Sequence, residues 1–250
     1  MSSPPAQAAS PDRRRSARVF LAQLRRASGD VVVWSFFPVA LLVALALVVS
    51  LPHDLRTAPP NVVAELGTDV AVSLVSNLLV ISAIMGALSV TLAYRTGVLA
   101  RELVFGSAAV VFGARAALSV VFALLFGIFS VAVLDLTFVA ISERSLFSPR
   151  EALVTMAVLG SAGLWGFLVG ALLRDPLLVL FVVPATLMPA LVLAHVVPAI
   201  ADVLPLRAQL AAAGLLRTGL TAPIAGCVLL GWLIVATAVV SLVLRVRDRI

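Results

Sequence analysis

Few residues in this sequence could do chemistry, and the clearest of them lie inside apolar stretches. Asp135 and His195 are the ionisable groups there, and a charge inside hydrocarbon costs enough free energy to call for a functional hypothesis. Asp135 could line a polar path as a proton or cation site, or it could reach the membrane interface and pair with Arg144 or Arg150. We favour the interfacial role. A lone histidine such as His195 is more often a packed or interfacial residue than a ligand.

No catalytic or metal-binding set is indicated. The two histidines, His53 and His195, are far apart and form no H-E-x-x-H pair, and Cys227 is the single cysteine. No G-x-S-x-G pentapeptide occurs either. Gly160 and Ser161 with Gly163 come nearest to it, and the glycine series of Gly160, Gly163, Gly166 and Gly170 is typical of close helix packing in a membrane.

Nucleotide binding by a P-loop is excluded by the basic residues. All 18 of them are arginine, and the P-loop signature requires a lysine that reaches the phosphates. Any ATP-driven work therefore needs a partner subunit, and we expect no cofactor on this chain itself. No basic stripe lies on a soluble domain, so nucleic acid is not an expected partner.

Composition places the chain in a lipid bilayer. Of its 250 residues, 62% are hydrophobic and 12% are charged, against about 45–50% apolar and about 25% charged in soluble domains. Since a bilayer core needs about 20 apolar residues per helix, stretches without charge mark the spans. We predict an all-α protein with six transmembrane helices, at about 31–51, 70–93, 116–141, 152–173, 176–199 and 221–244.

Two parts of this layout need a choice. Residues 103–141 carry only Arg115 and Asp135 as charges and have no turn-forming residue near their middle, so we expect one span preceded by a short surface helix. Pro184, Pro189 and Pro198 are expected to bend or break the fifth span, with short helices following at 204–219.

The distribution of arginine predicts the orientation. With six spans, most of the 18 arginines fall on the side that holds both termini, and cytoplasmic flanks retain arginine. Both termini are therefore expected in the cytoplasm, at the inner membrane. Residues 13–30 are predicted to form an amphipathic interfacial helix, and residues 1–12, rich in Pro, Ser and Ala, a disordered tail.

Polar residues on the second span leave two interpretations open. Ser73 and Asn77 lie near one helical face, where they could bond to neighbouring helices or line a transport path. Hydrogen bonding between helices is the simpler interpretation.

The stretch between the second and third spans carries a family resemblance. It reads Tyr94-Arg95-Thr96-Gly97-Val98-Leu99-Ala100-Arg101-Glu102-Leu103, followed by Gly113-Ala114-Arg115. With the span layout, it resembles a permease subunit of the type-2 ATP-binding-cassette (ABC) exporters. The resemblance assigns Gly97, Arg101, Glu102 and Arg115 to a coupling helix that docks on the ATPase. The family's usual Pro after this helix is absent here, where Val104-Phe105-Gly106 follows. An ordinary solvated loop remains the alternative.

The resemblance implies a transport subunit rather than an enzyme. Its partners would be an ABC ATPase that binds the ATP, a second permease copy or a homologous permease, and the bilayer. The cargo would be hydrophobic or amphipathic, such as a lipid, a drug or a peptide antibiotic. The alternative function is a secondary transporter driven by an ion gradient, with Asp135 as its proton or cation site. Ser73, Asn77 and Asp135 are the candidate residues of a transport path.

Overall fold

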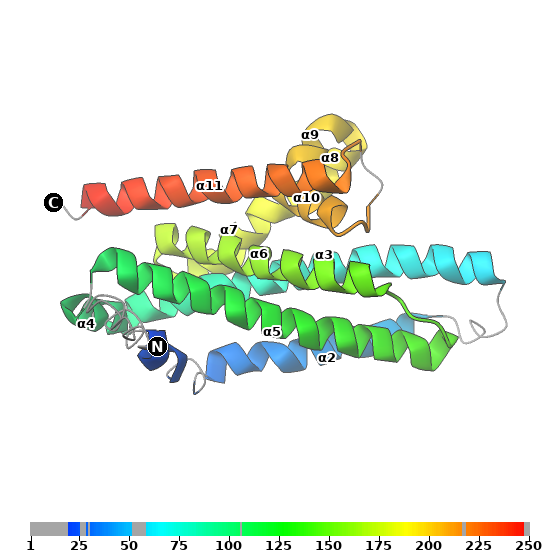
Figure 1. Cartoon of the computed structure of the whole chain (residues 1–250), viewed down its shortest axis with the longest axis horizontal. Helices are drawn as coiled ribbons and strands as arrows, with labels where there is room; N and C mark the ends of the chain where they lie inside the picture. Colours follow the sequence, from blue (N-terminus) through cyan, green and yellow to red (C-terminus); the bar gives the residue numbers. More distant parts are fainter. Residues whose placement is uncertain are drawn as a thin grey trace, which may run out of the picture.

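The computed structural model describes residues 20–25, 29, 31–51, 59–105, 107–216 and 219–247. Every regular element in these ranges is a helix, which confirms the all-α prediction (Figure 1). The predicted tail at 1–12 and most of the predicted interfacial helix at 13–30 lie outside the described residues. Of the latter, residues 20–25 are helical and lie beside the end of the bundle that holds α4.

The helices follow one another with short connections. Their bounds are α2 Val31–Ser50, α3 Pro60–Arg95, α4 Val98–Phe105, α5 Ala108–Ser142, α6 Pro149–Leu173, α7 Pro176–Leu187, α8 Pro189–Val196, α9 Pro198–Val203, α10 Pro205–Ala212 and α11 Ala222–Arg247.

Five helical stretches in the described part of the chain are long and apolar enough to cross a membrane. They are Asn61–Arg95, Ala108–Ser142, Pro149–Leu173, Pro176–Val196 and Ala222–Val246. The chain thus has the architecture of a multi-pass membrane protein. Helix α2 is also apolar and has 20 residues. Its stretch Val31–Ala46, however, is shorter than the 18 residues required of a membrane span.

Two helices are longer than the spans predicted within them. Helix α3 begins at Pro60 instead of near residue 70, and its 36 residues measure about 54 Å at 1.5 Å per residue. It can therefore extend beyond a hydrocarbon core of about 30 Å and carry Glu65 and Asp69 outside it. Helix α5 begins at Ala108 instead of near residue 116, so the separate short helix is α4.

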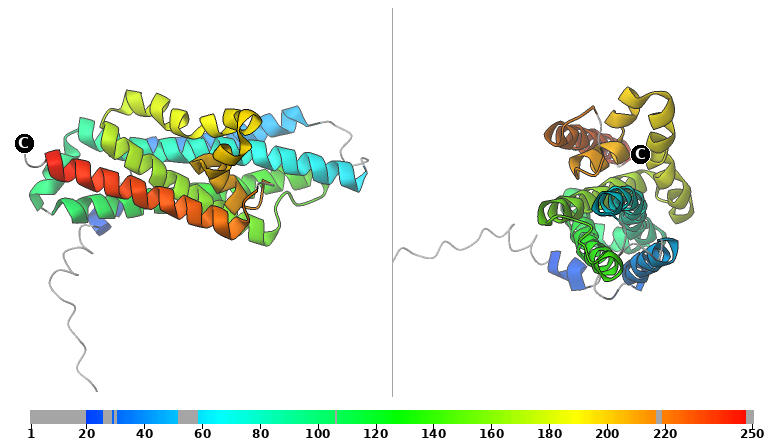
Figure 2. Two further views of the ribbon diagram at one scale, coloured as in Figure 1. Left: turned by 90° about the horizontal axis from the view of Figure 1, so that it is seen from above. Right: turned by 90° about the vertical axis from the view of Figure 1, so that its right-hand side faces the viewer.

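Helix α3 is the centre of the bundle. It packs against α2, α5, α6, α7 and α10, and its most extensive contact is with α6. The view along the bundle in Figure 2 shows these helices around α3, while α11 stands at the periphery against α6 and α10.

Glycine sets the closeness of the α3–α6 contact, as predicted for the series on α6. A Cβ on Gly166 would overlap the carbonyl oxygen of Ala83, and one on Gly170 would lie 2.7 Å from that of Ala87. From the α3 side, a Cβ on Gly86 would overlap the carbonyl oxygen of Gly163. Because the backbones touch, Ser82 on α3 can donate a hydrogen bond of 2.8 Å to the Leu159 carbonyl oxygen on α6.

Proline defines the segments that follow α6. Helices α7, α8, α9 and α10 each have a proline in their first turn, where its missing N–H costs no helical hydrogen bond. The predicted fifth span is accordingly interrupted at Met188, between α7 and α8. The short helices expected at 204–219 include α10, whose residues are largely buried against α11, α3 and α6.

Candidate functional site

The corner between α3 and α4 is a sharp turn built on glycine. Helix α3 ends at Arg95, and Thr96 closes it by donating both its backbone N–H and its hydroxyl to the Leu92 carbonyl oxygen. Gly97 then adopts a φ of +66°, in the left-handed region that residues with a Cβ avoid. This conformation reverses the chain, so that α4 begins at Val98.

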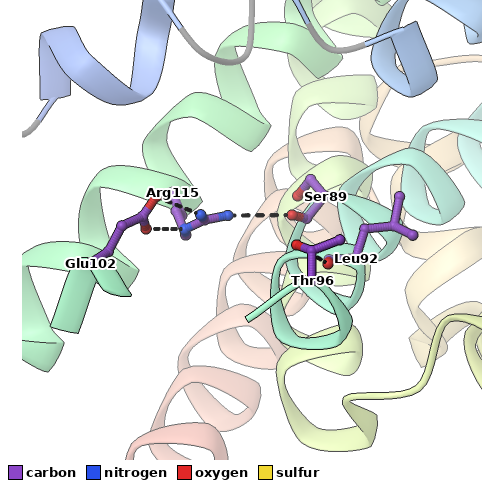
Figure 3. A network of polar contacts seen from close by, with 5 residues as sticks. All are labelled: Ser89, Leu92, Thr96, Glu102 and Arg115. Carbon is purple, nitrogen blue, oxygen red and sulfur yellow. Dashed lines mark hydrogen bonds and ion pairs between the residues drawn. The ribbon is translucent and has the colours of Figure 1, made fainter. Parts of the chain in front are cut away.

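An ion pair joins α4 to α5. Arg115 on α5 donates from Nε and Nη2 to the two carboxylate oxygens of Glu102 on α4, both at 2.8 Å, and its Nη1 lies 3.5 Å from the Ser89 carbonyl oxygen on α3 (Figure 3). The Arg115 side chain is 10% exposed and that of Glu102 is 21% exposed. Because two hydrogen bonds join the side chains and little solvent reaches them, the pair fixes the orientation of α4 relative to α5. Arg115 thereby links α3, α4 and α5.

Helix α4 presents a different face outward. Val98 and Leu99 are buried against the bundle, whereas Arg101, Leu103 and Val104 are exposed. The backbone N–H of Arg101 donates to the Gly97 carbonyl oxygen, but its guanidinium forms no hydrogen bond or ion pair with any residue that the structure describes. Of the four predicted coupling residues, Gly97 makes the turn and Glu102 and Arg115 pair with each other. Arg101 is the one whose charge faces outward.

The polar residues of α3 lie on its exposed side. Ser73 and Asn77 are both exposed, and the Asn77 amide nitrogen donates a 3.0 Å hydrogen bond to the Ser73 carbonyl oxygen of its own helix. Glu65 and Asp69 are exposed at the same four-residue spacing, so four polar side chains form one row. Sequence reasoning missed the first two because it started the span near residue 70. The spacing of four was the available signal.

Asp135 anchors the loop between α5 and α6. Its Oδ1 accepts hydrogen bonds from the Ser145 hydroxyl at 2.8 Å, the Leu146 backbone N–H at 2.7 Å and the Phe147 backbone N–H at 3.3 Å. These contacts give the carboxylate a structural role at the end of the bundle opposite α4. They agree with the interfacial interpretation more closely than with an ion site.

Two features of the α8–α10 region were not foreseen. Asp202 pairs with Arg207 at 2.8 Å and also accepts the Gly219 backbone N–H at 3.1 Å, which ties α9 and α10 to the chain that enters α11. Gln209 is fully buried on α10, and neither end of its amide has a hydrogen-bond partner in the structure. His195, by contrast, is exposed near the end of α8.

Charge separates the two ends of the bundle. At the end that holds α4, the arginines whose side chains are described are Arg25, Arg95, Arg101, Arg115, Arg174 and Arg245, with only Glu102 and Asp175 as described acids. Towards the opposite end lie Arg144, Arg150 and Arg207, together with Glu65, Asp69, Asp135, Glu143, Glu151 and Asp202. Arginine is therefore concentrated at the end of the bundle that holds residues 20–25, α4 and the last turns of α11.

Comparison with known proteins adds no relative to this picture. No protein-family model, no curated protein and no solved structure matches the chain. What the chain's own features define is a class: a helical, multi-pass membrane protein with one basic end and a short helix folded against that end.

Proposed function

We propose that this chain is the permease subunit of an ABC exporter, and that ATP bound by a separate ATPase subunit drives its transport. The observation that carries the proposal is the position of α4, a short helix at the basic end of the bundle held by the Glu102–Arg115 pair. A mechanical input needs a rigid element that a partner can push, and α4 is such an element.

The proposal uses six spans, with α2 as the first. Helix α2 has 20 residues, about 30 Å at 1.5 Å per residue, which matches the thickness of a hydrocarbon core. An even number of spans leaves residues 20–25 and the end of α11 on one side, in keeping with their common position in Figure 1. Arginine-rich ends remain in the cytoplasm, so α4 would face the cytoplasm at the inner membrane.

Arg101 is the docking charge in this proposal. It points away from the bundle beside exposed Leu103 and Val104, and a cationic side chain with an apolar surround is suited to an acidic, partly apolar groove on an ATPase. Glu102 and Arg115 are instead the positioning pair that keeps α4 in place.

The transported molecule would pass along the exposed row on α3. A polar side chain that faces lipid is unfavourable, so Ser73 and Asn77 are better explained by a hydrated path or by a second permease across from them. The largely apolar interior of the bundle favours a hydrophobic or amphipathic cargo such as a lipid, a drug or a peptide antibiotic.

The test is reconstitution with the ABC ATPase encoded beside this gene. We expect the two chains to co-purify and the permease to raise ATP turnover in proteoliposomes. Arg101→Glu should abolish both effects while the permease stays folded, because Arg101 has no described partner to lose.

Arg150→Glu is the matched control, since Arg150 is an equally exposed arginine at the opposite end. The proposal is wrong if no ATPase lies in the gene neighbourhood, or if Arg101→Glu and Arg150→Glu bind the ATPase equally well.

A further inference from the structure

A cavity of about 440 Å³ opens between α5, α6 and α11, near the basic end of the bundle. Its size is within the range of about 300–1,000 Å³ that is common for sites of small ligands. Helix α11 packs on α6 and α10 and leaves this space beside the first turns of α5. The residues that line it are Ala108, Ala109, Phe112, Gly113, Ala116, Phe167, Leu168, Thr237, Val240, Ser241, Leu244 and Arg245.

The floor of the cavity is apolar and rigid. Phe167 and Leu168 of α6 and Val240 of α11 are buried and pack together there. On the α5 side, small residues make the room. A Cβ on Gly113 would meet no atom within 4 Å, so the space in front of it is open.

One positive side chain belongs to this mostly apolar lining, which also includes the hydroxyl groups of Thr237 and Ser241. Arg245 is exposed in the last turns of α11, and its guanidinium makes no hydrogen bond or ion pair with another residue in the described part of the chain. Across the cavity, Ala108 and Ala109 form the first turn of α5, whose dipole has its positive end there. An apolar slot beside two positive features fits a molecule with an apolar chain and an anionic head.

We propose that this cavity holds an acyl chain of an anionic phospholipid from the surrounding leaflet, with its phosphate beside Arg245. The occupant comes from the bilayer because the slot lies between the lipid-facing surfaces of α5 and α11, where acyl chains are the solvent. An arginine at the membrane interface attracts an anionic head group more strongly than a zwitterionic one, because the zwitterionic head group has no net charge. The proposal rests on the membrane position of these helices and is independent of ATP-driven transport.

The experiment is native mass spectrometry of the purified full-length chain in detergent, with phosphatidylglycerol and phosphatidylcholine added in turn. We expect one phosphatidylglycerol to be retained per chain, about fivefold more strongly than phosphatidylcholine. Arg245→Gln should remove that preference, whereas Arg150→Gln, at the other end of the bundle, should leave it unchanged.

Filling the slot tests the acyl-chain part separately. Gly113→Leu should abolish lipid retention, because its side chain would occupy the open space. Gly231→Leu on α11 is the matched control, since a Cβ there also meets no atom within 4 Å but Gly231 does not line the cavity. Ala116→Leu provides a second filling variant should Gly113→Leu fail to fold, as judged by gel filtration.

Three results would overturn the proposal. In the first, the filled variants keep the lipid. In the second, phosphatidylcholine binds as strongly as phosphatidylglycerol and Arg245→Gln changes nothing. In the third, the chain is a lipid-free dimer that the filled variants dissociate, which would make a second copy the occupant. None of these results bears on capture of the ATPase by Arg101.

Discussion

The guanidinium of Arg115 donates two hydrogen bonds of 2.8 Å to the carboxylate of Glu102, and thereby fastens α4 to α5 across the turn at Gly97. Both side chains have little contact with solvent. Under the proposed function, a displacement of α4 would pass through this pair to α5 and, by the contact of Arg115 with Ser89, to α3.

The first prediction concerns that pair. Arg115→Glu should destabilise the chain by about 3 kcal/mol, because it leaves a half-buried carboxylate without its counter-charge and adds a second one. Glu102→Arg should cost a similar amount. The double variant with the two charges exchanged should recover most of the loss, as measured by the temperature at which the detergent-solubilised protein aggregates. Equal instability of the double and single variants would show that the charges do not act as a pair.

The second prediction concerns the α3–α6 contact. Gly166→Ala should destabilise the bundle by about 3 kcal/mol or more, because the added Cβ overlaps the backbone of Ala83 and the helices must separate. Gly231→Ala, where the Cβ meets open space, should be neutral or stabilising by about 0.5–1 kcal/mol. The comparison is again made by thermal aggregation in detergent. If both variants lose the same stability, the close contact between Gly166 and the backbone of Ala83 is not the cause of the loss.

The third prediction separates a structural Asp135 from an ion-coupling one. Asp135→Asn keeps an oxygen that can accept the hydrogen bonds of Leu146 and Phe147, so we expect nearly normal stability and transport. Asp135→Ala removes the acceptor and should cost about 1.5–3 kcal/mol. Transport into proteoliposomes and thermal stability are measured side by side. Loss of a transport driven by an ion gradient in a stable Asp135→Asn protein would instead support the secondary-transporter alternative.

Much of the architecture could be predicted from the sequence, because a helix that crosses the hydrocarbon core must be apolar over about 20 residues. The absence of charge over lengths of about 20 residues identified where helices run, and Pro189 and Pro198 marked where α8 and α9 begin, whereas Pro184 lies inside α7. The residues at which helices begin and end were harder to predict. The third span was predicted to begin near residue 116, yet α5 begins at Ala108 and includes Arg115, whose charge is paired with that of Glu102.

Contacts between helices could be predicted only where a residue type has one dominant structural role, as glycine has in close helix packing. The glycines of α6 indicated close packing, and the partner helix, α3, follows from the fold alone. The pairing of Glu102 with Arg115, 13 residues apart, depends on the turn at Gly97 and on where α5 begins. The buried amide of Gln209 and the Asp202–Arg207 pair depend in the same way on how α9 and α10 fold back.

The last prediction concerns the exposed polar row on α3. Asn77→Leu should leave stability unchanged or raise it, because the amide nitrogen bonds only the Ser73 carbonyl oxygen of its own helix. Transport by the reconstituted complex should fall about tenfold, which corresponds to the loss of about 1.4 kcal/mol of polar interaction with the passing molecule. Ser76→Ala is the matched control. Ser76 makes the same kind of bond within α3, to the Val72 carbonyl oxygen at 2.6 Å, but is buried away from the row. Full transport by Asn77→Leu would remove Asn77 from the path. Equal losses in the two variants would point to the shape of α3 as the cause.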